Sequence, residues 1–172
     1  MKKSIISILM MLAALTSSAQ IRLKTPNTEM VLEANKGKNL EILYFGNHIS
    51  DTDLESIWST GIPGYEAYPV YGIWPDRETA LEVTHADGNL STQLKVESVS
   101  TTQEPTATVT AIRLKDTAYP FYVTVYYRAY NDVDMIETWT EIENQEKKPV
   151  RLTRFDSGTL PIRYGNVCSG FS

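Results

Sequence analysis

The sequence predicts an all-β protein built as an antiparallel β-sandwich. Polar and apolar residues alternate along most of the chain, which is the pattern of strands buried on one face. The segments are short, and clusters of Asn, Asp, Gly and Pro separate them. From residue 20 onward the sequence shows no apolar helical period sustained over three turns. Many short strands between explicit turns are typical of a sandwich.

The first nineteen residues are expected to form a signal peptide. Two lysines follow the first methionine, residues 5–15 are an apolar run too short to span a membrane stably, and residues 17–19 are small. The alternative is a buried N-terminal helix, but the order of these three features favours a cleaved leader. We therefore expect an exported protein, periplasmic or secreted, with residues 1–19 as the leader and residues 20–172 as one domain.

Nine segments have the composition of half-buried strands. The strongest is residues 121–130, which are β-branched and aromatic almost throughout. In residues 80–85 the alternation places Leu81, Val83 and His85 on one face. The nine segments are 21–25, 29–34, 39–49, 80–85, 90–99, 108–115, 121–130, 135–143 and 150–155.

Turn chemistry is explicit between these segments. Asp87 and Gly88 form the clearest signal, because both tolerate positive φ, and they predict a two-residue hairpin. Residues 51–59 are expected to form a single helical turn, with Asp51 or Asp53 as the N-cap. The Gly-Ile-Pro-Gly sequence that follows predicts the end of that turn.

Charge and cysteine content exclude several classes of partner. The leader carries two lysines and no acid, so its removal changes the formal net charge from −5 to −7. An acidic chain without a basic run is not expected to bind nucleic acid or an anionic membrane. Cys168 is the one cysteine and is expected to be an incidental thiol, so no disulfide framework is predicted.

The titratable residues do not predict a catalytic or metal site. Glu82 and His85 are three apart and would point to opposite faces of a strand, so we expect no metal and no cofactor. His85 is instead expected to be a packed, hydrogen-bonded strand residue beside the hairpin. A glycosidase needs two carboxyl groups that flank the scissile bond. Acidic residues gather at 76–87 and 132–134, but turns favour Asp and no spacing selects a pair, so no catalytic residue is assigned.

Aromatic residues are concentrated between positions 58 and 74. Their flat rings suit the faces of sugars, and the neighbouring Asp76 and Arg77 can bond to hydroxyl groups. The equally weighted alternative is an irregular loop that is anchored by its own aromatic side chains. The five residues are Trp58, Tyr65, Tyr68, Tyr71 and Trp74.

This same region resembles a known family. Residues 68–89, YPVYGIWPDRETALEVTHADGN, are similar to the stretch of family 36 α-galactosidases in which YPEYG precedes a strand and a hairpin. The segments VTVYYRAYNDVDMIETWTEIEN and KKPVRLTR also resemble the amino-terminal domain of those enzymes. The likeness extends from about residue 20 to residue 164.

The resemblance implies a fold and a place in a larger enzyme. In that family a galactose-mutarotase-like β-supersandwich precedes a (β/α)₈ barrel, where one aspartate is the nucleophile and another the acid/base, with retention of configuration. These 172 residues do not include such a barrel, and the final CSGFS departs from the family pattern. We therefore expect a partial supersandwich, incomplete at its C-terminal end and inactive alone.

The resemblance also selects substrate-binding candidates. In relatives this loop lies near the mouth of the barrel, in some oligomers that of a neighbouring subunit, which implies roles for Trp74, Asp76 and Arg77. The aspartate is shifted relative to the arginine, which departs from the family. The expected function is the exported, carbohydrate-associated domain of an α-galactosidase. Its expected partners are α-galactosides, the barrel of the same polypeptide and, in a homo-oligomer, further copies. The alternatives are a stand-alone carbohydrate-binding sandwich and a structural or oligomerisation domain.

Overall fold

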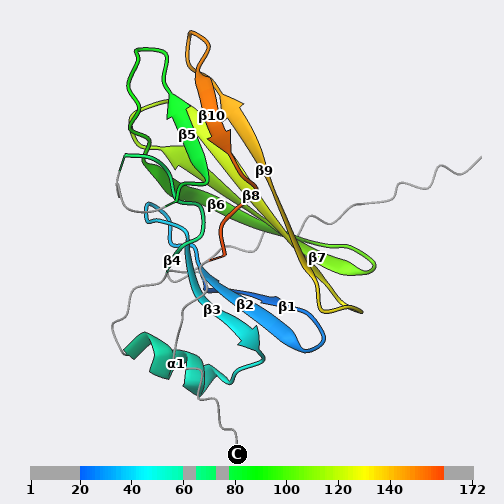
Figure 1. Cartoon of the computed structure of the whole chain (residues 1–172). Helices are drawn as coiled ribbons and strands as arrows, with labels where there is room; N and C mark the ends of the chain where they lie inside the picture. Colours follow the sequence, from blue (N-terminus) through cyan, green and yellow to red (C-terminus); the bar gives the residue numbers. More distant parts are fainter. Residues whose placement is uncertain (1–19, 60–64, 73–77, 161–172) are drawn as a thin grey trace, which may run out of the picture.

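The computed structural model describes residues 20–59, 65–72 and 78–160, and Figure 1 shows the arrangement of its elements. The predicted signal peptide lies outside these residues. The described elements are β1 (Gln20–Lys24), β2 (Thr28–Glu33), β3 (Glu41–Asn47), α1 (Asp51–Ser59), β4 (Tyr65–Glu66), β5 (Leu81–Thr84), β6 (Leu94–Gln103), β7 (Ala107–Asp116), β8 (Phe121–Tyr130), β9 (Ile136–Asn144) and β10 (Arg151–Phe155).

Four long strands form the larger layer, in the order β6-β7-β8-β9, with every neighbouring pair antiparallel. Strand β8 lies inside this sheet, and its ten residues alternate between buried and half-buried positions. The period of two reflects the opposite directions of successive side chains in a strand. The buried face of β8 consists of Phe121, Val123, Val125, Tyr127 and Ala129.

The second layer is made of two smaller antiparallel sheets, β1-β2-β3-β4 and β10-β5. In Figure 1 the pair β5 and β10 lies over one end of the large sheet, and β1–β3 lie toward the other. Apolar residues of all three sheets join in one core, for example Leu32 of β2, Leu81 of β5 and Val123 of β8, each 0 % exposed. The antiparallel all-β sandwich predicted from the sequence is confirmed.

The other face of the large sheet is covered by its own long side chains. The guanidinium of Arg113 lies over the ring of Tyr122, 4.2 Å from its centroid. The rings of Tyr126 and Trp139 are parallel, with centroids 4.8 Å apart. Arg113 also pairs with Glu143 at 2.7 Å. These contacts explain why the residues of β8 on this face are half-buried.

Helix α1 is longer than the single turn expected, because it spans nine residues. Its N-cap is also not the predicted aspartate. The Oγ of Ser50 accepts the N–H of Asp53 at 3.1 Å, so Ser50 is the N-cap, and its hydroxyl donates to the Asp53 carboxylate at 2.7 Å. Neither α1 nor any other described segment is a helix long and apolar enough to cross a membrane.

All nine predicted segments contain strands, but one predicted connection is wrong. The turn at residues 85–89 forms, with φ of +91° at Gly88 and a hydrogen bond of 2.8 Å from His85 N to Asn89 O. Its flanking strands do not pair with each other. Strand β5 pairs with β10 and β6 pairs with β7, so the chain passes from one layer to the other at this turn.

Candidate functional site

The loop that carries the predicted sugar-binding residues has a clamped base. Val70 precedes the loop and Leu81 follows it, and these two residues form an isolated β-bridge. The Tyr71 N–H donates a hydrogen bond to Leu81 O at 3.2 Å. Tyr71 O in turn accepts the N–H of Thr92 at 3.1 Å. The two ends of the loop are therefore held side by side on the sandwich. Residues 73–77, and with them Trp74, Asp76 and Arg77, lie outside the described residues, so their assignment stays a prediction.

A hollow of about 300 Å³ lies beside this base, and we call it the Gly72 hollow. Gly72 has φ of +119°, and a Cβ there would meet Ser91 Cα at 2.9 Å, so the close approach of the loop to Ser91 requires glycine. Side chains with neutral amide and hydroxyl groups dominate the walls, which suits a neutral hydroxylated ligand. The lining residues are Gly72, Asn89, Ser91, Thr92, Gln93, Asp116, Thr117 and Ala118.

Asp116 holds the wall of this hollow in place. The side chain is buried, and its carboxylate accepts backbone N–H groups from Gln93 at 2.6 Å and from Ala118 and Tyr119 at 2.8 Å each. Asp116 lies in the connection between the predicted strand segments 108–115 and 121–130, and turns favour Asp. The sequence did not predict that the Asp116 carboxylate would join the residue before β6 to the residues after β7.

The aromatic residues of this region do not form one platform. Tyr68 is 2 % exposed and belongs to the core, where burial raises the pKa of its hydroxyl to about 12. Tyr71 is 47 % exposed and Tyr65 is half-buried. The interpretation of all five residues as a sugar platform is therefore wrong for Tyr68, which anchors the segment. The side chains of Trp58 and Trp74 lie outside the described residues.

His85 joins several loops at the same end of the sandwich. Its side chain is 0 % exposed, Nδ1–H donates to the Glu146 carboxylate at 2.7 Å, and the Thr92 hydroxyl lies 3.0 Å from Nε2. The ring stacks on Tyr119 with centroids 3.8 Å apart. Thr92, His85 and Glu146 have the order of a nucleophile, base and acid, but Thr92 is 1 % exposed, although it borders the Gly72 hollow. The prediction of a packed, hydrogen-bonded histidine is confirmed, but β5 ends at Thr84, so His85 follows the strand and is not part of it.

Hydrogen bonds hold several of the described carboxyl groups in place within the fold. Asp87 accepts Asn89 N–H at 2.9 Å and the Tyr119 hydroxyl at 2.8 Å, and these bonds hold the pKa of Asp87 below its usual range. Glu82 accepts hydroxyl donors at 3.0 and 3.2 Å. Where a carboxyl pKa is displaced in the described residues, it is displaced downward, whereas a glycosidase acid needs a raised pKa.

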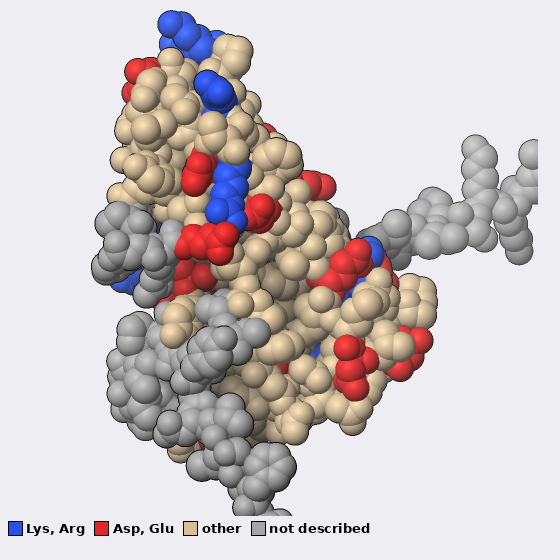
Figure 2. All heavy atoms as spheres, viewed as in Figure 1, with Lys and Arg blue, Asp and Glu red and all other residues tan. Residues whose placement is uncertain are grey.

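The described residues also contain no group of three or more His, Cys, Asp or Glu side chains that could hold a metal ion. Ion pairs instead link neighbouring elements, as Arg154 does with Glu78 and with Asp156, both at 2.8 Å. On the face that Figure 2 shows, basic and acidic side chains stand close together over the upper part of the molecule.

The fold defines the class of this protein: it is an all-β, antiparallel sandwich domain that carries a clamped surface loop. Comparison with protein families gives a closer assignment. The model of the glycosyl hydrolase family 36 N-terminal domain matches residues 38–168, most of the chain. The chain belongs to this family. A search of curated proteins found no match.

Solved structures of family 36 α-galactosidases share the fold. An AgaA variant from Geobacillus stearothermophilus in complex with stachyose is 19 % identical, with a TM-score of 0.71 over 81 % of this chain and 24 % of that one. The enzyme from Lactobacillus brevis is 17 % identical, with a TM-score of 0.68 over 82 % of this chain and 23 % of that one. The chain therefore spans about a quarter of the length of these enzymes.

Proposed function

We propose that this chain is the exported, amino-terminal, carbohydrate-associated domain of an α-galactosidase. The observation that carries the proposal is the family 36 N-terminal match over residues 38–168. Complexes of G. stearothermophilus AgaA with raffinose and stachyose support terminal α-galactosides as the substrates of the parent enzyme. The parent enzyme hydrolyses them with retention, through two aspartates of a barrel that joins this sandwich domain.

The domain contributes a rim to the sugar site. Trp74 offers an aromatic face to the sugar, and Asp76 and Arg77 bond to its hydroxyl groups. The clamped base at Tyr71 and Leu81 supports this role, because a fixed base lowers the entropy lost when a loop orders around a ligand. The barrel that completes the site comes from the same polypeptide, or from a neighbouring subunit in a homo-oligomer.

A stand-alone carbohydrate-binding sandwich is the second candidate. The Gly72 hollow favours it, because this chain alone places amide and hydroxyl groups beside the clamped loop. The two candidates differ in what they require. The first needs a catalytic barrel, and the second binds sugar without one.

Purified residues 20–172 are expected not to hydrolyse an aryl α-galactoside above the buffer rate. Retaining hydrolysis needs two carboxyl groups about 5–5.5 Å apart, one of them with a raised pKa. Release of the aryl group, followed by absorbance, measures the rate. The variants Asp76→Asn and Glu82→Gln, each of which replaces one carboxyl group with an amide, are assayed beside the unaltered chain. Turnover by the unaltered chain that disappears in either variant would contradict the proposal, because this domain would then supply its own catalytic acid.

A further inference from the structure

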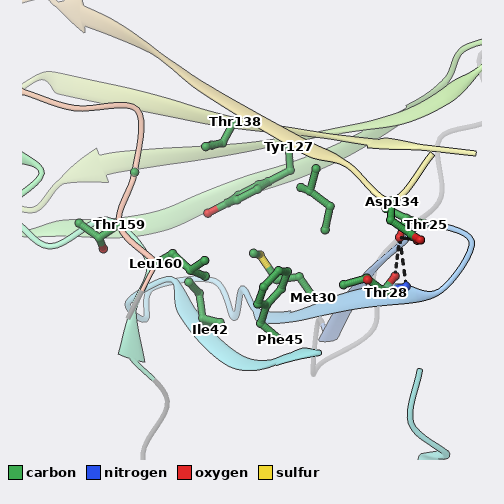
Figure 3. A pocket seen from close by; sticks show the side chains of 12 residues that line it. Thr25, Thr28, Met30, Ile42, Phe45, Tyr127, Asp134, Thr138, Thr159 and Leu160 are labelled. Carbon is green, nitrogen blue, oxygen red and sulfur yellow. Dashed lines mark hydrogen bonds between the residues drawn. The ribbon is translucent and has the colours of Figure 1, made fainter. Parts of the chain in front are cut away.

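A second cavity, of about 220 Å³, lies between the two layers of the sandwich, away from the clamped loop, and we call it the inter-sheet pocket (Figure 3). Strands β2 and β3 form one wall, and β8 and β9 form the other. The segment after β10 contributes to the rim. The lining residues are Thr25, Thr28, Met30, Ile42, Phe45, Tyr127, Asp134, Ile136, Thr138, Gly158, Thr159 and Leu160.

Tyr127 brings an unpartnered hydroxyl group to this pocket. The residue is 4 % exposed, and burial raises the pKa of its hydroxyl. Figure 3 shows the hydroxyl pointing along the pocket toward Thr159 and Leu160. It makes no hydrogen bond within the described residues, and it is not one of their fully buried polar atoms that lack a partner, so it is accessible from the pocket. A ligand hydroxyl group that enters the pocket can therefore bond to it.

The rest of the lining has both apolar and hydroxyl surfaces. Met30, Ile42 and Ile136 supply aliphatic contacts, and Phe45 is 47 % exposed beside them. Thr28, Thr138 and Thr159 add hydroxyl groups. A ligand with one apolar face and several hydroxyl groups matches these surfaces, whereas a purely apolar ligand would leave the Tyr127 hydroxyl unpaired.

The Asp134 carboxylate disfavours an anionic ligand in the pocket. Its carboxylate accepts the Thr25 hydroxyl at 2.8 Å and the backbone and side-chain N–H groups of Asn27 at 2.7 Å each. These bonds lower the pKa of Asp134, so it stays ionised at neutral pH and repels an anion. The two carboxylate oxygens together accept three donors from Thr25 and Asn27, and these bonds hold the side chain in place.

We propose that the inter-sheet pocket binds one pyranose ring of a neutral sugar, with the Tyr127 hydroxyl bonded to the sugar and Phe45 against its apolar face. The volume lies below the roughly 300–1,000 Å³ of pockets for drug-sized ligands, so it takes one ring while a second extends through the open rim. This site is separate from the proposed α-galactosidase site, because neither the loop of residues 73–77 nor a barrel takes part.

Titration of residues 20–172 with melibiose, followed by NMR amide shifts, tests the proposal. Binding is expected with the largest shifts at Thr138 and Ile136, and Tyr127→Phe is expected to weaken it about tenfold, the value of one hydrogen bond. The control is Tyr126→Phe on the same strand. Its hydroxyl bonds to Glu141 at 2.8 Å on the opposite face, so affinity should not change.

The outcomes separate this site from the proposed loop site. Because Tyr127→Phe removes no hydrogen bond within the described residues, its melting temperature should equal or exceed that of the unaltered chain. An absence of binding, or equal affinity in Tyr127→Phe, would overturn the pocket. Binding lost in Trp74→Ala but kept in Tyr127→Phe would also overturn it, while supporting the loop. Binding weakened in Tyr127→Phe and kept in Trp74→Ala supports the pocket, whatever the loop does.

Discussion

Replacement of His85 with alanine is expected to destabilise the domain by about 3–5 kcal/mol, the cost of removing one partner of a buried polar pair. The Glu146 carboxylate, whose side chain is 6 % exposed, would lose its bond of 2.7 Å to Nδ1. The variant would also lose two ring contacts of His85. The imidazole stacks on the Tyr119 ring with centroids 3.8 Å apart and meets the Phe121 ring edge-on with centroids 5.8 Å apart. Urea unfolding curves with unchanged slope would measure the loss.

Tyr119→Phe is the matched control for this result. It keeps the ring that stacks on His85 and removes the hydroxyl that bonds to Asp87 and Asn89 on the exposed side. Because these bonds are lost, the free energy of unfolding is expected to fall by about 1 kcal/mol. Equal losses for the two variants would show that the buried pair does not hold the loops together.

Glu29→Gln is expected to lower the free energy of unfolding by about 2–3 kcal/mol at neutral pH. This is the magnitude of the charge-assisted hydrogen bonds that the substitution removes from a buried site. The Glu29 side chain is 0 % exposed, and its carboxylate accepts Arg22 at 2.6 Å and Ile49 N–H at 3.1 Å. These bonds fasten the segment before α1 to β1 and β2. The cost is below that of a fully buried pair because the Arg22 side chain is 21 % exposed and also pairs with Asp51.

The same variant should change the dependence of stability on pH. Burial acts to raise the pKa of Glu29, but the hydrogen bonds from Arg22 and Ile49 and the nearby positive charges outweigh it and lower the pKa below 4.5. The unfolded chain therefore takes up the proton at higher pH than the folded one. The stabilisation is present above about pH 4.5 and is lost as the pH falls through the folded value.

Comparison of unfolding free energies at pH 7 and pH 3 measures this effect. The difference in unfolding free energy between the unaltered chain and Glu29→Gln should be largest at neutral pH and should become smaller in acid. The carboxyl groups of Asp87, Asp134 and Glu143, whose pKa values are also lowered, are present in both proteins. A difference that stays constant between the two pH values would mean that Glu29 does not titrate as described.

The strands could be predicted from sequence because their signal is local. Alternation along β8 and along residues 80–85 specifies which side chains are buried, and the structure buries those residues. The pairing of strands is not local. Leu81 of β5 lies opposite Phe155 of β10, so the turn at Asp87 and Gly88 could not reveal the partner of β5.

The candidate site was predictable only in part. Aromatic residues mark the segment in sequence, but the distinction between the core residue Tyr68 and the exposed Tyr71 depends on the sheet beneath them. Glu29 has the pattern of a solvent-facing strand residue, and its burial depends on residues near position 50. The inter-sheet pocket is lined by residues of β2, β3, β8 and β9 and by residues after β10. Because these segments are far apart in the chain, no single stretch of sequence predicts the cavity.

The central claim is that this chain is the amino-terminal domain of an α-galactosidase, and the coding DNA tests it most directly. Sequencing of the source DNA beyond the Ser172 codon should reveal, in one of the three forward frames, a (β/α)₈ barrel with two catalytic aspartates. DNA that encodes no barrel in any frame would contradict the claim and would favour a self-sufficient sugar-binding domain.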